Sequence, residues 1–503
     1  MGRPFNDPTE DAQAKLTERV HSDSSDSKRL TGHSLIAKNT LFLFVSKILG
    51  FAGFFYFMIV AANELGKERF GSLSTAISYA SVFLILSDLG LSILIVREIG
   101  RNRENLGKYY SNGSLVKIIL AVITLVAALL VLPLCHYKTD TVRVMPLILL
   151  ATLALSYVQF LGGLFRGIER MEYEAFMFVI EKVVILVFGL AWLYAGGGLM
   201  GVAAVILAAR TLSMASGLFF LRTRIDGLQP RLDPAFAQRM IVDAYPFAPF
   251  AFFAAAYFQI DIFVLSLIRQ DEVGLLRAAL QLVTVWFIII DSYSGALLPV
   301  LSRAFVESPR NLNETCRRGL RYMTLAGLPL ALGISALARE IMTVYKEEFH
   351  PAWIALAIAA WAILFRLLTG IPSTLLTAVN RQLQRSYVVA IACALSVALN
   401  VLLIRRVGYV GCAITTVVTN VFMLVAYGYL AHRAGFTILP DDRTFRVYLA
   451  GALMLGALYL SSPLGLFAKA AIGAVVYGLA VLALRVVSRH EIRQVMRLFS
   501  GRT

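Results

Sequence analysis

Charged side chains lie inside apolar stretches of this sequence that are long enough to span a membrane. A charge that faces lipid at mid-depth costs about 2.5–3.5 kcal/mol or more, so these side chains should face protein or a water-filled cavity. Fixed positive charge suits an anionic ligand because it replaces the hydration that a phosphate loses, and arginine adds a planar fork that matches phosphate oxygens. The basic residues that we expect to line such a cavity and bind substrate are Lys47, Arg210, Arg277 and Arg366.

Three further features of these charges have structural interpretations. Lys117 lies close enough to the inner end of its span that we expect its amine to reach the membrane surface. Glu181 and Lys182 are adjacent in the chain and should point to different faces of their helix. Asp261 and Arg277 fall at similar depths, so a purely structural ion pair between them stays open as an alternative to ligand binding.

Acidic residues within the spans are candidates for carrying a coupling ion. Four carboxylates lie in apolar stretches, and the sequence does not distinguish among them: Asp88, Glu181, Asp261 and Asp291. A proton gradient, a sodium gradient or the gradient of the substrate itself would drive transport. A charge moved across 100 mV gains about 2.3 kcal/mol, which is enough to bias a transport cycle.

The sequence carries no motif for nucleotide hydrolysis, metal binding or nucleophilic catalysis. It has no G-x-x-x-x-G-K-[ST] sequence, and its 4 cysteines form no C-x-x-C pair. Its 6 histidines are scattered among tails and loops. We therefore predict no catalytic residue, no metal site and no cofactor.

The composition is typical of a membrane protein. Of the 503 residues, 58% are hydrophobic and 16% are charged, whereas soluble domains average about 45–50% and about 25%. These values argue against a soluble enzyme and against an intrinsically disordered chain. The net charge of +16 is assigned to cytoplasmic loops and not to a nucleic-acid surface.

Apolar runs recur from Leu35 onward, and about 20 apolar residues suffice to cross a bilayer core of roughly 30 Å. We predict an all-α integral membrane protein with about 14 transmembrane helices, at 36–62, 71–96, 112–134, 143–165, 175–195, 199–221, 244–268, 273–300, 320–345, 352–376, 386–404, 408–431, 446–462 and 466–485. Lys and Arg flank these spans unevenly, with 28 on the side of the amino end and 10 on the opposite side. This bias places both termini in the cytoplasm.

Faint internal repeats indicate two lobes. Gly71 and Gly274 lie in similar segments 203 positions apart, and the same offset carries Asp88 onto Asp291. Parallel repeats of this kind occur in several transporters. We therefore divide the chain into a disordered cytoplasmic tail (1–34), an amino-terminal six-helix lobe (35–221), a cytoplasmic linker (222–240), a carboxyl-terminal six-helix lobe (241–431), two extra helices (432–485) and an amphipathic cytoplasmic tail (486–503).

Several short motifs resemble those of the Wzx-type polysaccharide and O-antigen flippases, a branch of the multidrug/oligosaccharidyl-lipid/polysaccharide exporter superfamily. These motifs are Ser46-Lys47-Ile-Leu-Gly50-Phe51, Gly66, Phe70-Gly71, Ser87-Asp88-Leu-Gly90-Leu91, Arg97-Glu98 and Gly408-Tyr-Val-Gly411. The resemblance covers about residues 35–485. Lys47 stands where the related lipid II flippases carry a basic residue, which ranks it first among the cavity candidates.

The resemblance implies a multi-pass flippase of the bacterial cytoplasmic (inner) membrane that works by alternating access. Its substrate would be a polyprenyl-diphosphate-linked oligosaccharide, moved from the inner to the outer leaflet for surface polysaccharide biosynthesis, such as lipopolysaccharide O-antigen or exopolysaccharide. Membrane lipids and a polysaccharide polymerase are the further partners that we expect, and nucleic acid is not among them.

Three other functions remain open. A drug/cation antiporter of the same superfamily would need a cavity dominated by carboxylates, whereas basic residues outnumber acidic ones within the spans by six to four. A lipid II flippase would share most of the features above. A membrane enzyme of glycan assembly would need an acid–base cluster at one membrane face, and the sequence places no such cluster beside its short outer loops.

Overall fold

The computed structural model describes residues 49–225, 231–245, 248–307, 309–436, 441–461 and 464–486. Within these ranges the chain forms α-helices and short 3-10 helices and no strand. The predictions for Lys47, for the tail 1–34 and for nearly all of the tail 486–503 lie outside the described residues. The side chain of Asp291 lies outside them too, although its backbone belongs to a helix.

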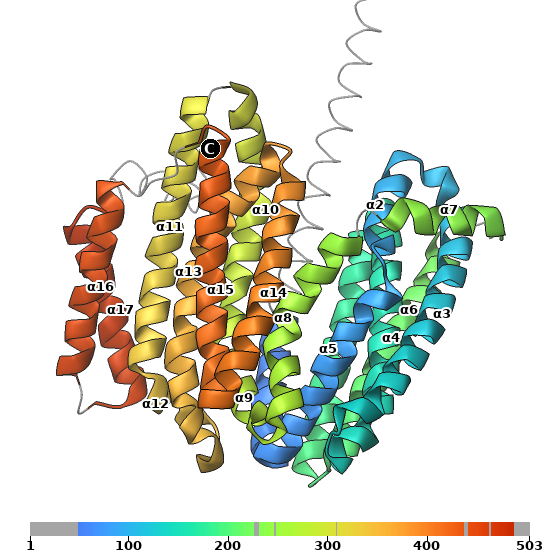
Figure 1. The fold of residues 1–503 in the computed structure, drawn as a ribbon, viewed down its shortest axis with the longest axis horizontal. Coiled ribbons are helices and arrows are strands. Elements are labelled where there is room, and N and C mark those ends of the chain that lie inside the picture. Colours follow the sequence, from blue (N-terminus) through green and yellow to red (C-terminus); the bar gives the residue numbers. More distant parts are fainter. Residues whose placement is uncertain are drawn as a thin grey trace, which may run out of the picture.

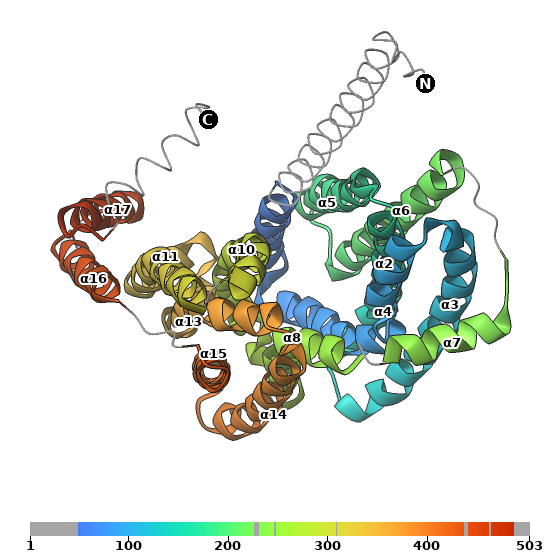
Figure 2. The same cartoon turned by 90° about the horizontal axis from the view of Figure 1, so that it is seen from above.

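The first half of the chain forms one group of helices, on the right in Figure 1. Its members are the helical segment Leu49–Ser87, α2 (Leu91–Arg101), α3 (Leu106–Val131), α4 (Thr139–Gly167), α5 (Met171–Tyr194) and α6 (Leu199–Arg224). The predicted polar linker that follows contains α7 (Pro234–Ala244), whose amino end is capped by the Asp233 carboxylate. Because α7 packs on α2 and α3, the linker is attached to this first group (Figure 2).

The second half forms the other group, in the centre of Figure 1, with a hairpin at its outer edge. The group consists of α8 (Ala248–Ile268), α9 (Val273–Thr284), α10 (Ile288–Glu307), α11 (Pro309–Ala336), α12 (Ala338–Ile341), α13 (Trp353–Ala378), α14 (Gln382–Val407) and α15 (Tyr409–Arg433). The hairpin of α16 (Asp442–Leu460) and α17 (Leu466–Ala483) packs against α11. An ion pair of 3.1 Å between the buried Arg321 and the partly exposed Asp441 ties the start of this hairpin to α11.

The helices establish a multi-pass membrane protein, as the composition predicts. Within the described residues, 10 helices are long and apolar enough to cross a membrane. The number rises to 11 if the helix Asn311–Ala336 and the following Ala338–Val344, which are bent by 76° relative to each other, form one span. Each predicted span is helical wherever the described residues cover it, but the total of 14 crossings stays a prediction.

The first two predicted spans share one helical segment, Leu49–Ser87, of 39 residues. A straight helix of that length would measure about 58 Å, roughly twice the thickness of the bilayer core. The backbone of Gly66 lies at φ +77°, a left-handed conformation that interrupts regular α-helical geometry. Gly66 is in the predicted loop between the two spans, so the segment divides there into two halves of membrane-spanning length.

Hydrogen bonds join the two groups at one end of the molecule, which we call the joined end. It carries the loops around residues 66, 138, 270 and 346 and lies at the bottom of Figure 1, near α9 and α12. The Asn63 side chain donates to the carbonyl of Val344 at 3.0 Å and accepts from the Lys346 amide at 2.9 Å. The Lys138 amide donates to the Gln270 side chain at 2.9 Å, and the Lys138 ammonium pairs with Asp271.

The two glycines of the internal repeat meet at this joined end. A Cβ atom on Gly71 would lie 3.1 Å from the amide nitrogen of Gly274, and one on Gly274 would lie 2.3 Å from the carbonyl oxygen of Lys67. Glycine therefore permits the two groups to approach backbone to backbone. Toward the opposite end, which carries α2, α7 and the end of α10, the ribbons of the two groups diverge (Figure 1).

Candidate functional site

One carboxylate in the first group pairs with two cationic side chains at mid-span. The Glu181 side chain, on α5, accepts from the Lys182 ammonium at 2.8 Å and lies 3.8 Å from the Arg210 guanidinium on α6. Arg210 also donates to the Thr152 hydroxyl of α4 at 3.4 Å. The prediction that Glu181 and Lys182 point to different faces is wrong, because both side chains are long enough to fold toward each other from adjacent positions. The cluster of these three charged residues carries one excess positive charge.

The cluster lies against the helical segment that follows the Ser46–Phe51 motif. The Lys182 ammonium is 4.7 Å from the ring centre of Phe54 and 5.3 Å from that of Phe178, which is cation–π geometry. A Cβ atom on Gly50 would lie only 2.5 Å from the Phe178 ring and 3.1 Å from the Lys182 side chain. The motif glycine thus allows the segment to pack closely on α5, although Lys47 itself lies outside the described residues.

A buried ion pair joins Lys117 to Asp88. The Lys117 side chain, on α3, is 2% exposed, and its ammonium pairs with the Asp88 carboxylate. It also donates to the Ser87 carbonyl at 3.1 Å and to the Ser156 hydroxyl of α4 at 2.9 Å. The prediction that Lys117 reaches the membrane surface is therefore wrong. A buried lysine whose ammonium meets three oxygen acceptors is more stable inside the protein than extended through lipid.

The same aspartate organises a break in the second span. The Asp88 carboxylate accepts from the Ser92 hydroxyl at 2.6 Å, in the first turn of α2. Leu89 and Gly90 adopt left-handed backbone conformations, with φ of +45° and +81°. The Ser87-Asp-Leu-Gly-Leu motif therefore interrupts the helix with a turn whose left-handed backbone Gly90 tolerates without strain. Asp88 thus has a structural role at this turn, in addition to the ion-coupling role that the sequence suggested.

A second intramembrane carboxylate, that of Asp261 on α8, is held by neutral donors. Ser396 donates to it at 2.9 Å, Asn400 at 2.6 Å and Thr416 at 2.7 Å. These donors come from α14 and α15, so three helices converge on one oxygen-rich site. The alternative of an ion pair between Asp261 and Arg277 is wrong for the described residues, where neither side chain is bridged to the other.

Arg277 occupies a separate place on α9. Its Nε atom is buried and has no hydrogen-bond partner among the described residues. The residue that follows it, Ala278, accepts a hydrogen bond of 3.4 Å from the buried hydroxyl of Tyr345. Arg277 thus lies near the joined end, in surroundings separate from those of Arg210 and Arg366.

A cavity of about 270 Å³ lies within the second group and contains Arg366. Arg366, on α13, stacks between two aromatic rings, 4.5 Å from the centre of Phe258 and 5.0 Å from that of Phe287. Arg385, near the start of α14, also lines the cavity, and it donates to the Thr377 hydroxyl at 2.8 Å. Sequence reasoning missed Arg385, because it assigned this arginine to a cytoplasmic loop.

Hydroxyl and aromatic side chains complete the wall of this cavity. Its further lining residues come from α8, α10, α13, α14 and α15: Tyr257, Phe258, Ile290, Ser294, Thr369, Gly370, Ser373, Thr374, Val389, Met423 and Tyr427. None of these described lining residues is acidic. Asp291 follows Ile290 on α10, but its side chain is not among those described. The described wall thus presents hydroxyl groups and aromatic rings beside the two arginines.

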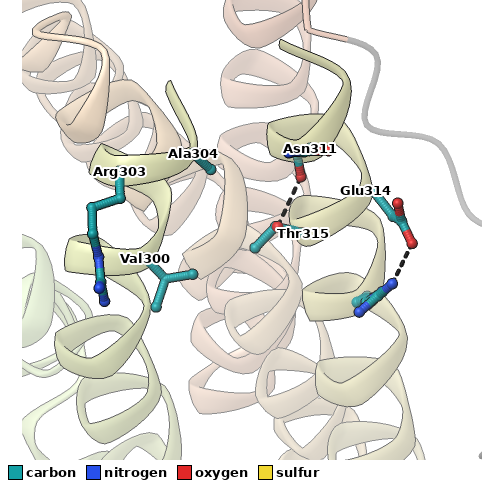
Figure 3. A pocket seen from close by; sticks show the side chains of 7 residues that line it. Val300, Arg303, Ala304, Asn311, Glu314 and Thr315 are labelled. Carbon is teal, nitrogen blue, oxygen red and sulfur yellow. Dashed lines mark hydrogen bonds and ion pairs between the residues drawn. The ribbon is translucent and has the colours of Figure 1, made fainter. Parts of the chain in front are cut away.

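Another hollow of about 360 Å³ lies between the adjoining ends of α10 and α11 (Figure 3). Figure 3 shows Arg303 on one side and Asn311, Glu314 and Thr315 on the other. Glu314 pairs with Arg318 in the same wall, and both side chains are more than half exposed. Because a carboxylate offsets one of its two arginines and water reaches both, this hollow is a weaker anion site than the cavity around Arg366.

The predicted cations thus fall into three separate environments. Arg210 belongs to an ion-paired cluster of the first group, Arg277 lies near the joined end, and Arg366 lines a cavity of the second group. Within the described residues, no group of three His, Cys, Asp or Glu side chains could hold a metal ion.

Comparisons with known proteins give consistent likenesses. The family model described as "Polysaccharide biosynthesis protein" matches residues 36–305, and the model described as "MatE" matches residues 250–403. The probable low-salt glycan biosynthesis flippase Agl15 of Haloferax volcanii is 22% identical over 389 residues, which is 76% of this chain and 80% of the relative.

Several solved structures share the fold, and two of them follow. The lipid II flippase MurJ, in an inward closed conformation, has a TM-score of 0.74 at 11% sequence identity, over 88% of this chain and 99% of that chain. A multidrug resistance MATE family transporter of the MOP superfamily, in an inward-facing conformation, has a TM-score of 0.66 at 14% identity, over 76% of this chain and 94% of that chain. These likenesses establish a common helical architecture.

Proposed function

Because this chain belongs to the polysaccharide biosynthesis protein family, we propose that it is a flippase for a polyprenyl-diphosphate-linked oligosaccharide. It would move this substrate from the inner to the outer leaflet of a bacterial cytoplasmic membrane and act as a transporter, not an enzyme. The name of its relative Agl15, a probable glycan biosynthesis flippase, supports a lipid-linked glycan as substrate. The product would then be available to a polysaccharide polymerase at the outer surface.

The observation that carries this proposal is the excess positive charge at mid-span. In the first group, Lys182 and Arg210 share the single carboxylate of Glu181. In the second group, Arg366 lies between the rings of Phe258 and Phe287 and lines a cavity with Arg385, which is near the start of α14. The one positive charge that Glu181 leaves unbalanced in the first group is costly inside a membrane protein unless a ligand or water compensates it, and a diphosphate would supply that compensation.

The joined end is proposed to be the outer side. Its loops are the ones that carry fewer Lys and Arg in the sequence, whereas the diverging end carries the basic loops. Both termini would then be cytoplasmic, and the conformation would be open toward the cytoplasm. The two groups of helices would serve as the two lobes of an alternating-access cycle, rocking about the contact at the joined end while the polyprenyl tail remains in lipid.

Replacing Arg210 by alanine tests the substrate contact of the first lobe. We expect at least a tenfold lower flipping rate, since a charge-assisted hydrogen bond is worth about 1.5–3 kcal/mol. Glu181 keeps Lys182 as its partner, so the variant should fold. The rate is measured in proteoliposomes that contain an undecaprenyl-diphosphate-linked oligosaccharide, with lipid II as a parallel substrate.

The exposed Arg406 provides the matched control, because Arg406→Ala removes the same charge from the end of α14. The substrate proposal fails if the wild-type protein flips only lipid II or neither lipid. The role of Arg210 fails if Arg210→Ala and Arg406→Ala flip the glycan at equal rates.

Ion coupling is assigned to Asp261 among the four carboxylates. Glu181 and Asp88 are already bridged to cations, whereas Asp261 accepts hydrogen bonds from the neutral groups of Ser396, Asn400 and Thr416. A carboxylate surrounded by neutral donors can accept a proton or a sodium ion without first breaking an ion pair. The side chain of Asp291 lies outside the described residues, so its candidacy stays a prediction.

Asp261→Asn should therefore uncouple transport from ion gradients. The substitution keeps the shape of the side chain and removes its charge, so flipping should proceed at a rate that no longer responds to an imposed sodium or proton gradient. The ratio of rates with and without each gradient is the measurement. Asp243→Asn, on the exposed face of α7, is the control. An undiminished response in Asp261→Asn would remove the assignment.

A further inference from the structure

We propose that α7 carries a binding surface for anionic phospholipids of the leaflet at the diverging end. Three large apolar side chains near the end of this helix are exposed: Ile241 at 42%, Val242 at 66% and Tyr245 at 70%. The proposal goes beyond the flippase function, because it concerns the linker between the two groups of helices and not the path of the substrate. If the joined end is the outer side, as proposed, this leaflet is the cytoplasmic one.

The start of α7 lies at the level of the lipid headgroups. The Asn112 side chain, on α3, donates to the Arg231 carbonyl at 2.9 Å and accepts from the Asp233 amide at 2.8 Å. The first exposed side chains of α3 are those of Ile118 and Ile119, which begin six positions further along. At about 1.5 Å per residue, Ile118 lies about 9 Å deeper than Asn112. The headgroup region extends roughly 5–8 Å on each side of the bilayer core, so α7 begins close to it.

The path of α7 suits a helix that lies in the membrane surface. In Figure 1 it runs transversely, across the ends of the helices of the first group, and Figure 2 shows it at the edge of that group. A helix in this place has one side against the protein, a second toward the acyl chains and a third toward headgroups and water. Each side should then carry its own type of residue.

The residues of α7 follow this division when successive positions are turned by about 100° around the helix. The buried residues lie on the side that packs on α2 and α3: Ala237, Met240 and Ala244. The exposed residues of the second side are apolar apart from one glutamine: Pro234, Ala235, Gln238, Ile241, Val242 and Tyr245. The third side carries the exposed Arg239 and Asp243. Tyrosine is a residue that is enriched at membrane–water interfaces.

Contacts within the protein fix α7 in this orientation. The Asp233 carboxylate accepts from the Phe236 amide at 3.0 Å and pairs with the Lys108 ammonium at 3.2 Å. The same ammonium lies 4.3 Å from the centre of the Phe236 ring. The helix is therefore held from its first turn, and its apolar second side stays exposed without a partner among the described residues.

Arg239 supplies the contact to a lipid phosphate. It lies about 60° around the helix from Val242, at the border between the apolar side and the third side. Its methylene stem can cover apolar surface while its guanidinium binds a phosphate at the headgroup level. Among the described residues no carboxylate forms an ion pair with Arg239, and Asp233 is already paired with Lys108. A basic side chain at this level favours anionic over zwitterionic lipids.

A lipid surface is a better occupant of this side than a second protein. The exposed apolar side chains cover little more than one turn of a short helix. A stable protein interface takes roughly 800 Å² from each partner, which three side chains do not provide. Insertion of the same three side chains into the boundary between headgroups and acyl chains needs no such area, because the bilayer surrounds them.

The first test measures whether the apolar side is inserted, in the purified full-length protein in nanodiscs. Cys135, the partly exposed one of the four native cysteines, is first replaced by serine. Val242→Cys and Asp243→Cys are then labelled separately with the fluorophore NBD. A nitroxide in the upper acyl chain of phosphatidylcholine should quench the label at 242 at least twofold more than the label at 243, since these neighbours point to different sides of the helix.

The second test measures the preference for anionic lipid. Nitroxide-labelled phosphatidylglycerol and phosphatidylcholine are compared as quenchers of the label at 242, at equal mole fractions. We expect a roughly fivefold local enrichment of phosphatidylglycerol at low salt, because one basic residue near the surface contributes about 1 kcal/mol. Arg239→Gln should bring the two lipids close to equality. Arg224→Gln, at the end of α6 on another side of the first group (Figure 2), should leave the enrichment unchanged.

Two results would overturn the lipid surface. Equal quenching at 242 and 243 would show that α7 does not insert, and a protein partner would then be the better occupant. Equal quenching by the two lipids in the parent, or an enrichment that Arg239→Gln leaves intact, would show that no anionic lipid binds through this arginine. Neither readout depends on transport, so a protein that shows the enrichment but flips no lipid-linked glycan would lose the flippase function and keep the surface.

Discussion

Lys117→Met should lower the free energy of unfolding by about 3–5 kcal/mol, because it leaves the Asp88 carboxylate without its buried partner. The pair lies between α3 and the break before α2, and the Lys117 ammonium also satisfies the Ser87 carbonyl and the Ser156 hydroxyl. Methionine preserves much of the volume and removes the charge, so the loss reports electrostatics more than packing. Unfolding in mixed detergent micelles provides the measurement.

A double substitution provides the internal control for this pair. Asp88→Asn combined with Lys117→Met removes both charges, and the neutral amide can still accept from Ser92 as the carboxylate does. We expect the double variant to recover more than half of the lost stability, since removal of a whole buried pair is often nearly neutral. A double variant as unstable as Lys117→Met alone would show that the ion pair is not the source of the effect.

The second large effect is expected at the contact between the repeat glycines. Gly274→Val would place a branched side chain where even a Cβ atom lies 2.3 Å from the Lys67 carbonyl oxygen. Backbone atoms on the other side cannot rotate away as a side chain could, so the two groups must separate at the joined end. We expect flipping to fall at least tenfold, because the transporter could no longer close this end.

Accessibility distinguishes opening of the joined end from misfolding. Ala76 is fully buried between the groups, so a cysteine introduced there should react slowly with a membrane-impermeant maleimide in the parent and quickly in Gly274→Val. The native Cys135 is replaced first, because it is the partly exposed cysteine among the four. Gly456→Val carries the same change of helix propensity at a glycine with no neighbour within 4 Å, and should flip normally. Equal labelling rates in Gly274→Val and its parent would show that the valine does not open the joined end.

Sequence reasoning succeeded where the physics is local. Each predicted span is a run of residues whose transfer into lipid is favourable residue by residue, and helices occupy these runs wherever the chain is described. The repeat also identified Gly71 and Gly274 as equivalent, although it gave no indication that they touch.

The partners of the charges could not be predicted, because pairing depends on how helices rotate and pack. Lys117 is 29 positions from Asp88, and Asp261 is 135 to 155 positions from its three donors. A shift of one residue in helix rotation turns a side chain by about 100°, which is enough to exchange a protein partner for lipid. Comparing depths in the membrane therefore led to a wrong ion-pair partner for Asp261. It also led to the wrong prediction that the Lys117 amine reaches the membrane surface.

By itself, the sequence determined that this chain lies in a membrane as a helical protein with basic residues inside its spans, because hydrophobicity and charge act through each residue's own transfer energy. Only the tertiary structure decided that Lys117 neutralises Asp88, that Lys182 and Arg210 share Glu181, and that Arg366 and Arg385 meet at one cavity. Those assignments depend on distances between helices, which no local property of the chain encodes.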